Sequence, residues 1–120
     1  MSALAISAAA LLAAASAPIT SEVAMFERVA IDSELRLYPI GILADTRCPD
    51  RELCFRNERL VVAAVVFDGN RRTGLAMEMG VPLRIAGGWL TLVSTTAKPR
   101  ENGATPLSEY ELTYVFEPID

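Results

Sequence analysis

Two cysteines, Cys48 and Cys54, constrain the fold of this 120-residue chain more than any other feature. They lie in one short stretch, residues 45–54, and apolar segments typical of β-strands lead into it and out of it. Their spacing is not that of the Cys-x-x-Cys redox motif, and a zinc site would need four ligands. We therefore predict a Cys48–Cys54 disulfide that closes a small loop between two strands.

The first residues of the chain are typical of a secretory signal peptide. Residues 1–17 carry no charge, their middle is nearly all Ala, Leu and Ile, and small residues follow it. We expect residues 1–17 to be a signal peptide and residues 18–120 to form a single β domain, with an uncleaved anchor or a core helix as the alternatives. Export to a periplasmic or extracellular compartment, with no membrane insertion after cleavage, would provide the oxidising conditions that a disulfide requires.

The first half of the remaining chain predicts three strands. Residues 23–31 and 34–43 alternate in polarity, and the phase of the second segment slips at Tyr38 and Pro39, which predicts a bulge or a bend. Residues 60–67 are apolar on both faces, so we expect this segment to be a central strand.

The second half of the chain adds further short strands and strong turn signals. Hairpin turns are indicated by Asp68-Gly69-Asn70 and by Gly87-Gly88. The expected strands are residues 73–79, 81–85, 89–96 and 110–116, the last with Tyr110, Leu112, Tyr114 and Phe116 facing inward. About seven short strands without a convincing helix predict an all-β, antiparallel β-sandwich, with a small β-barrel as the alternative.

Composition excludes several classes of function. A net charge of −4 argues against a nucleic-acid partner. The chain has no histidine, so it lacks the commonest general base and the partner that a serine nucleophile usually needs. The acidic residues Asp45, Asp50 and Glu52 lack the spacing of a calcium-binding loop, and we interpret them as solvated charges. We predict no catalytic, cofactor or metal site, and a protein that is not an enzyme.

Asp45 and Arg47 are the candidate structural residues of the cysteine loop. They lie two positions apart, so in an extended segment they share a side. Arginine donates several hydrogen bonds from a rigid fork, and aspartate commonly accepts them from nearby backbone amides. We expect the two side chains to anchor the loop. The alternative is that both are exposed and contact a partner.

The residues around the first cysteine also resemble a family motif. Asp45-Thr46-Arg47-Cys48-Pro49, followed by Cys54, is similar to the Asp-Ser-Arg-Cys-Pro…Cys pattern of small exported bacterial proteins, often lipoproteins, of no established function. Further matches are Leu37-Tyr38-Pro39, Gly87-Gly88 before Trp89, Pro99, and Tyr110 ahead of the last segment. The chain departs from the pattern after Cys54, where Phe55-Arg56-Asn57 replaces Trp-Ala-Gly. The resemblance implies a β fold and export.

These observations lead to two expected functions. The first is a non-enzymatic module of the bacterial envelope, structural or binding, with an unidentified protein or small ligand as its partner. The second is an inhibitor or ligand-capturing protein that acts through the Cys48–Cys54 loop, because a rigid loop carrying Arg51 would save ordering entropy when it binds.

Overall fold

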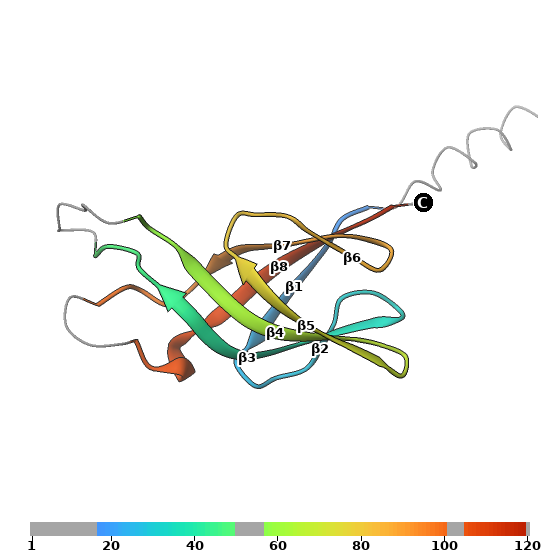
Figure 1. Ribbon diagram of the computed structural model, residues 1–120, viewed down its shortest axis with the longest axis horizontal. Helices are drawn as coiled ribbons and strands as arrows, with labels where there is room; N and C mark the ends of the chain where they lie inside the picture. Colours follow the sequence, from blue (N-terminus) through green and yellow to red (C-terminus); the bar gives the residue numbers. More distant parts are fainter. Residues whose placement is uncertain (1–16, 50–56, 101–104, 120) are drawn as a thin grey trace, which may run out of the picture.

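The computed structural model describes residues 17–49, 57–100 and 105–119. In these ranges the protein is all-β, and the one helical element is a short 3-10 turn, η1 (Leu107–Glu109). The strands are β1 (Ile19–Ala24), β2 (Val29–Ala30), β3 (Leu35–Asp45), β4 (Leu60–Asp68), β5 (Arg71–Glu78), β6 (Leu83–Ile85), β7 (Gly88–Thr95) and β8 (Glu111–Pro118) (Figure 1). The predicted all-β class is confirmed.

The strands form two antiparallel sheets of four strands each. The order in one sheet is β1-β8-β7-β6, and the order in the other is β2-β3-β4-β5. Strands β2 to β5 follow one another as a meander, whereas β1 pairs with β8 from Ile19 opposite Phe116 to Ala24 opposite Glu111. The first and last strands are therefore neighbours, and both ends of the described chain lie at one end of the molecule (Figure 1).

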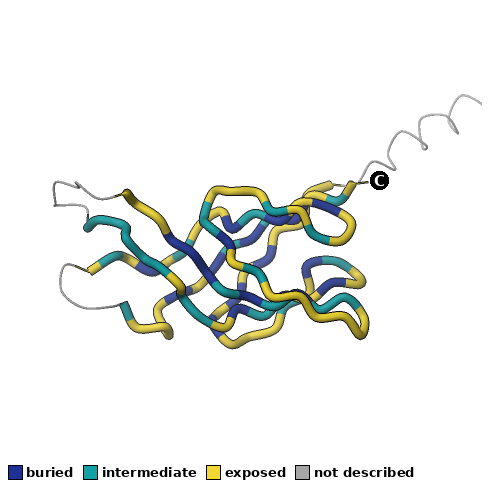
Figure 2. Tube along the Cα trace, in the orientation of Figure 1, coloured by how far each residue is buried: buried dark blue, intermediate teal, exposed yellow. Residues whose placement is uncertain are grey.

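A single hydrophobic core draws on both sheets. Every second residue of β8 is buried, namely Leu112, Tyr114 and Phe116, and Tyr110 just before the strand is buried too. Figure 2 shows the buried positions following the strands, with exposed residues at the turns. The expected inward face of the last strand is confirmed, because period-two alternation places one parity on each face.

Strand β4 has the central place that its sequence predicts. It pairs with β3 on one side and with β5 on the other. Leu60, Val62 and Ala64 lie in the core, while the outer face carries half-buried residues such as Val65. A strand covered on the inside and flanked on both sides needs few polar residues, which explains the unbroken apolar run.

The phase slip at Tyr38 and Pro39 corresponds to an irregular ladder, as predicted. The register between β3 and β4 shifts between Pro39 and Gly41 and again between Ile42 and Ala44. At the first shift the Pro39 carbonyl accepts a hydrogen bond from the Phe26 amide at 2.9 Å. The shifted ladder thus gives an acceptor to the chain that crosses from β1 to β2.

The predicted single strand over residues 23–31 is wrong. The segment contains the end of β1 and the whole of β2, which belong to different sheets and are separated by a turn at Met25 and Phe26. Phe26 has a φ of 64°, a left-handed value that no strand residue adopts. Both sheets bury apolar side chains in the same core. The alternation of apolar and polar residues therefore continues from β1 to β2, although the chain changes sheet between them.

Two other predictions fall largely outside the described residues. The expected signal peptide covers residues 1–17, of which only residue 17 is described, and Cys54 of the expected disulfide is not described. Within the ranges that are described, no helix has the length and apolarity required to span a membrane. The domain boundaries and the disulfide therefore stay predictions.

Two valines of β4 provide a test of which face is the core. Val62 is fully buried, whereas Val65 is half-buried on the outer face. We expect Val62→Asp to cost about 3–5 kcal/mol of unfolding free energy, because it strands a charge in the core. Val65→Asp should cost clearly less. Urea unfolding followed by tryptophan fluorescence measures both variants, and equal losses would contradict the assigned faces.

Candidate functional site

Two long connections leave the same end of the two sheets, and we call this region the loop end. Residues 46–59 join β3 to β4 and include both cysteines, while residues 96–110 join β7 to β8 in the other sheet. Figure 1 shows both connections at the end opposite the chain termini. At the loop end, contacts between the two connections can fix the position of one sheet relative to the other.

Asp45 and Arg47, the two residues selected from the sequence, form an ion pair at the base of the first connection. The Arg47 Nε donates to Asp45 Oδ1 at 2.8 Å, and Arg47 Nη2 donates to Oδ2 at 2.8 Å. Their side chains are only 15% and 14% exposed. Such a two-point contact fixes the orientation of both groups as well as their separation.

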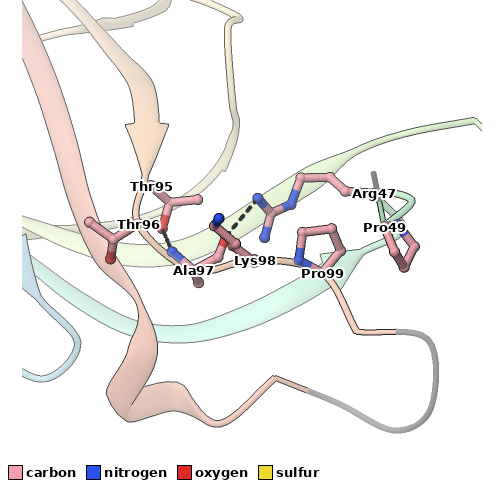
Figure 3. A pocket seen from close by; sticks show the side chains of 7 residues that line it. All are labelled: Arg47, Pro49, Thr95, Thr96, Ala97, Lys98 and Pro99. Carbon is pink, nitrogen blue, oxygen red and sulfur yellow. Dashed lines mark hydrogen bonds between the residues drawn. The ribbon is translucent and has the colours of Figure 1, made fainter. Parts of the chain in front are cut away.

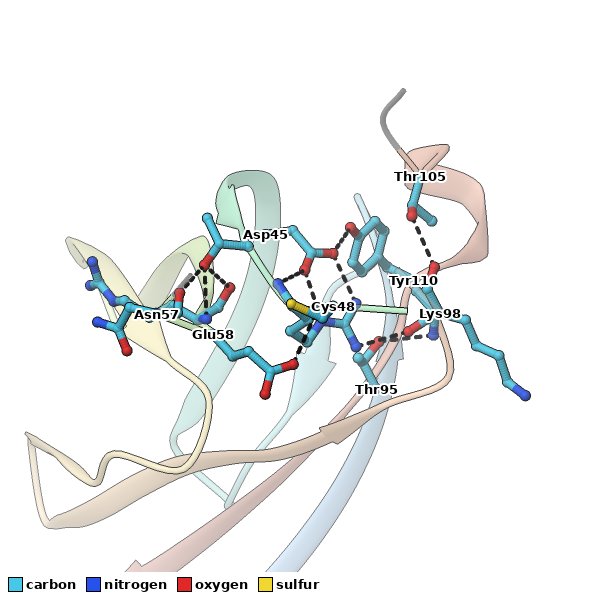
Figure 4. A network of polar contacts seen from close by, with 12 residues as sticks. Asp45, Cys48, Asn57, Glu58, Thr95, Lys98, Thr105 and Tyr110 are labelled. Carbon is cyan, nitrogen blue, oxygen red and sulfur yellow. Dashed lines mark hydrogen bonds and ion pairs between the residues drawn. The ribbon is translucent and has the colours of Figure 1, made fainter. Parts of the chain in front are cut away.

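The same pair reaches across to the other sheet. Arg47 Nη1 donates to the backbone carbonyl of Ala97, just after β7, at 3.0 Å (Figure 3). The Tyr110 hydroxyl, just before β8, donates to Asp45 Oδ2 at 2.5 Å (Figure 4). Asp45, Arg47 and Tyr110 thus make one polar cluster, here called the loop-end cluster, which joins the ends of β3, β7 and β8.

The cluster shifts the pKa of each of its members. Burial raises the pKa of Asp45, but hydrogen bonds from Arg47 and Tyr110 and the charge of Arg47 outweigh it and hold that pKa below its usual value. The hydrogen bond with Asp45 raises the pKa of Arg47. Burial, followed by the contact with Asp45, raises the pKa of Tyr110. At neutral pH the cluster therefore holds a carboxylate, a guanidinium and a neutral phenol.

A second set of bonds closes the base of the cysteine loop. The Thr46 amide donates to the Arg59 carbonyl at 2.8 Å, and the Arg59 amide donates to Thr46 Oγ1 at 2.9 Å. The Cys48 amide donates to the Glu58 side chain at 2.9 Å (Figure 4). These contacts continue the β3–β4 pairing beyond the end of the ladder, so the described part of the loop leaves the sheet along a fixed path.

Sequence reasoning identified Asp45 and Arg47 but missed three residues that complete the site. Tyr110 was identified only as an inward-facing residue, and Thr46 and Glu58 were not selected. A tyrosine at the first position of an alternating strand has a hydroxyl that usually needs a partner when buried, which was the available signal. Nothing in the local pattern indicates which carboxylate it reaches.

Two shallow hollows lie on either side of Arg47. The first measures about 330 Å³ and is lined by Pro49 and residues 95–99 (Figure 3). The second, of similar volume, is lined mainly by residues 58–60 with Met79 and Pro99. Ion pairs at the loop end are Arg59 with Glu78 at 3.0 Å and Arg100 with Glu109. The surface offers charged groups and proline edges to a polar ligand.

Of the three acidic residues near the cysteines, Asp45 lies among the described residues. Among the described residues no group of three or more histidine, cysteine or acidic side chains is arranged to hold a metal ion. Asp45 is engaged with Arg47 and Tyr110, while Asp50 and Glu52 lie outside the described residues. Cys54 also lies outside them, so the Cys48–Cys54 pairing is untested.

Comparison of the chain with protein-family models, curated proteins and solved structures finds no match in any of the three. The resemblance of residues 45–49 and Cys54 to small exported bacterial proteins therefore stays an expectation.

Two tyrosines allow a matched test of the loop-end cluster. Tyr110 donates its hydroxyl to Asp45, whereas the buried Tyr114 hydroxyl has no hydrogen-bond partner among the described residues. Tyr110→Phe should lower the free energy of unfolding by about 1–3 kcal/mol, since it removes one of the two hydrogen-bond donors to the partly buried Asp45 Oδ2. Tyr114→Phe should leave that free energy unchanged or raise it. Urea melts of both variants decide, and equal losses would contradict the assignment.

The depressed pKa of Asp45 gives the cluster a defined pH dependence. A carboxyl group whose folded-state pKa is lowered contributes stability above its unfolded pKa of about 3.9, and this is lost as the pH falls through the folded value. Asp45→Asn should therefore cost about 1–3 kcal/mol at pH 7 and progressively less below about pH 4. Urea melts at several pH values measure the difference. A constant difference from pH 7 to pH 2 would refute the electrostatic role.

Proposed function

We propose that this protein is a non-enzymatic, exported β domain of the bacterial envelope, periplasmic or extracellular, that acts as a structural or binding module. The observation that carries the proposal is the loop-end cluster. Arg47 and Asp45 connect the cysteine loop to Ala97 and Tyr110 of the other sheet, so the base of the loop is held from two sides. A loop with a fixed base presents its residues to a partner at a low entropy cost.

The chemistry of the cluster supports binding or structure over catalysis. Both Asp45 oxygens accept hydrogen bonds from Arg47 or Tyr110, and Arg47 also donates to Ala97. A general acid or base works best with a pKa close to the working pH. The shifts in this cluster move each pKa away from neutrality, which suits groups with fixed charges.

Export and a disulfide are part of the same proposal. Residues 1–17 have the composition of a signal peptide, and the motif around Cys48 resembles that of exported proteins. The Cys48–Cys54 bond would close a short ring above the fixed base of the loop, and it would contribute roughly 2–2.5 kcal/mol through loop entropy. An oxidising compartment favours such a bond.

The arrangement of the sheets favours a β-sandwich over a small barrel. The strand pairings keep β1, β8, β7 and β6 in one sheet and β2 to β5 in the other. Where β1 approaches β2, the contact is a side-chain bond from Ser21 Oγ to the Ala30 carbonyl at 3.3 Å. A barrel would need a continuous ladder around the whole circumference.

The second candidate is an inhibitor or ligand-capturing protein that acts through the Cys48–Cys54 loop. It is favoured by the anchored base of the loop and by the hollows beside Arg47. Arg51 would be its contact residue, and it lies outside the described residues. Both candidates place the partner at the loop end and differ in what the partner is.

Affinity capture from envelope extracts tests the proposal. The mature protein is compared with Arg51→Glu, which changes the loop, and with Arg36→Glu, a matched charge change at an exposed position of β3. We expect a specific envelope component to be retained by the wild type and by Arg36→Glu but lost with Arg51→Glu. Quantitative mass spectrometry measures retention.

Two results would contradict the proposal. An intact mass showing that the native protein retains residues 1–15 would contradict export with cleavage of a signal peptide. Retention of the same component by Arg51→Glu and by the wild type would oppose a role for the loop. Inhibition of a trypsin-like protease by the wild type and by the control variant, but not by Arg51→Glu, would favour the inhibitor.

A further inference from the structure

The four sheet edges of this protein are protected to very different degrees. Strand β2 has two residues and β6 has three, and such short edges offer little to an incoming strand. Strand β1 is bridged to β2 by the hydrogen bond from Ser21 to Ala30. Strand β5 is eight residues long, contains neither proline nor lysine, and carries no charge from Thr73 to Met77. Of the edges in the described part, β5 is the most open to pairing.

The backbone of β5 has hydrogen-bonding groups directed away from its sheet. The Met79 amide donates to the Leu60 carbonyl at 2.8 Å, which fixes the parity that bonds to β4. Because bonds alternate along an antiparallel ladder, the peptide groups of Arg72, Gly74 and Ala76 face outward. The Glu78 amide also faces outward, whereas the Glu78 carbonyl accepts a hydrogen bond from the Val81 amide at 3.1 Å. No strand in the described ranges pairs with this side of β5.

The same flank of the molecule is hollow. Between β5 and β6 lies a depression of about 330 Å³ with a mixed lining. Its apolar walls are Val66, Leu75, Ile85 and Ala86, and its polar walls are Asp68, Arg71, Thr73 and Arg84. Leu75 and Ile85 pack against the core but are only partly buried. On the β5–β6 flank the Gly80 amide, just after β5, donates to the Leu92 carbonyl of β7 at 2.8 Å. Next to the middle of β5, this flank still leaves the partly buried Leu75 and Ile85 accessible.

We propose that a second copy of this chain pairs with β5, edge to edge and antiparallel, across a two-fold axis at Leu75. The two sheets of β2 to β5 would then join into one continuous sheet of two protomers. In this register Arg72 lies opposite Glu78 of the partner subunit, and Gly74 lies opposite Ala76 of the partner subunit. The two-fold axis makes each of these pairs occur twice.

The charge pair between Arg72 and Glu78 favours this register over registers with the two-fold axis at Gly74 or Ala76. Arg72 makes no ion pair within the described residues, and Glu78 uses Oε1 for its contact with Arg59. Opposite charges directly across two strands are favourable. A two-fold axis at Gly74 would place Arg72 opposite Ala76, and an axis at Ala76 would place it opposite Gly80, so both lose the charge pair. At the centre, Leu75 and its symmetry mate would lie beside the apolar walls of the depression between β5 and β6.

Charge reversal tests the pairing and its register together. Sedimentation equilibrium of the mature wild type should show a monomer–dimer equilibrium. Arg72→Glu and Glu78→Arg should each raise the dissociation constant at least about tenfold, and the double variant Arg72→Glu/Glu78→Arg should restore it, because the pair is re-formed with the signs exchanged. Far-UV circular dichroism confirms that each variant is folded.

A backbone variant tests the hydrogen bonds independently of charge. Ala76→Pro removes an amide that faces away from β4, so the fold should persist while dimerisation is lost. Ala76→Ser, which keeps that amide, is the matched control and should dimerise as the wild type does.

Three results would overturn the proposal. The first is a wild type that stays monomeric up to about 1 mM, a concentration at which even weak dimers form. The second is a dimer that persists unchanged in both Arg72→Glu and Ala76→Pro. The third is a β5 edge that pairs only with a different protein.

Discussion

The structure depends on a half-buried ion pair that joins two sheets at one end. Asp45 ends β3 and Arg47 lies in the connection that follows it. Arg47 also bonds to Ala97 and Asp45 to Tyr110, both in the connection between β7 and β8 of the other sheet. Removing two charges from water is costly, and their attraction offsets that cost only when further hydrogen bonds satisfy the remaining groups. The Ala97 carbonyl and the Tyr110 hydroxyl supply such bonds, so the cluster stabilises only the arrangement in which all four groups meet.

The two flanks of the protein differ in how they are completed. On one flank Ser21 bonds to the Ala30 carbonyl, and the first strand pairs with the last. On the other flank β5 leaves peptide groups and the partly buried Leu75 accessible to solvent, beside a depression lined by both apolar and charged residues. Our two proposals use different surfaces, since the loop end presents the cysteine loop and the β5 edge pairs with a second copy. The two surfaces meet at Glu78, which pairs with Arg59 at the loop end and lies opposite Arg72 of the partner subunit in the proposed dimer.

Much of the fold could be predicted from the sequence, because most strands show a local alternation of apolar and polar residues. The central strand β4 and the inward residues of β8 follow directly from their patterns. The split of residues 23–31 could not be predicted, since both sheets bury the same kind of side chain and alternation does not say which sheet a strand joins. The cluster was predicted only in part. Asp45 and Arg47 are two residues apart, but Tyr110 is 65 residues away, and no local pattern encodes that contact.

The central claim is that Asp45 and Tyr110 act as one unit across the two sheets. A double-mutant cycle of Asp45→Asn and Tyr110→Phe, measured by urea unfolding at pH 7, tests it most directly. Residues in one hydrogen-bonded network couple by about 0.5–3 kcal/mol, and we predict a coupling in that range. Losses that add to within about 0.3 kcal/mol would show that the two residues act independently and would contradict the account.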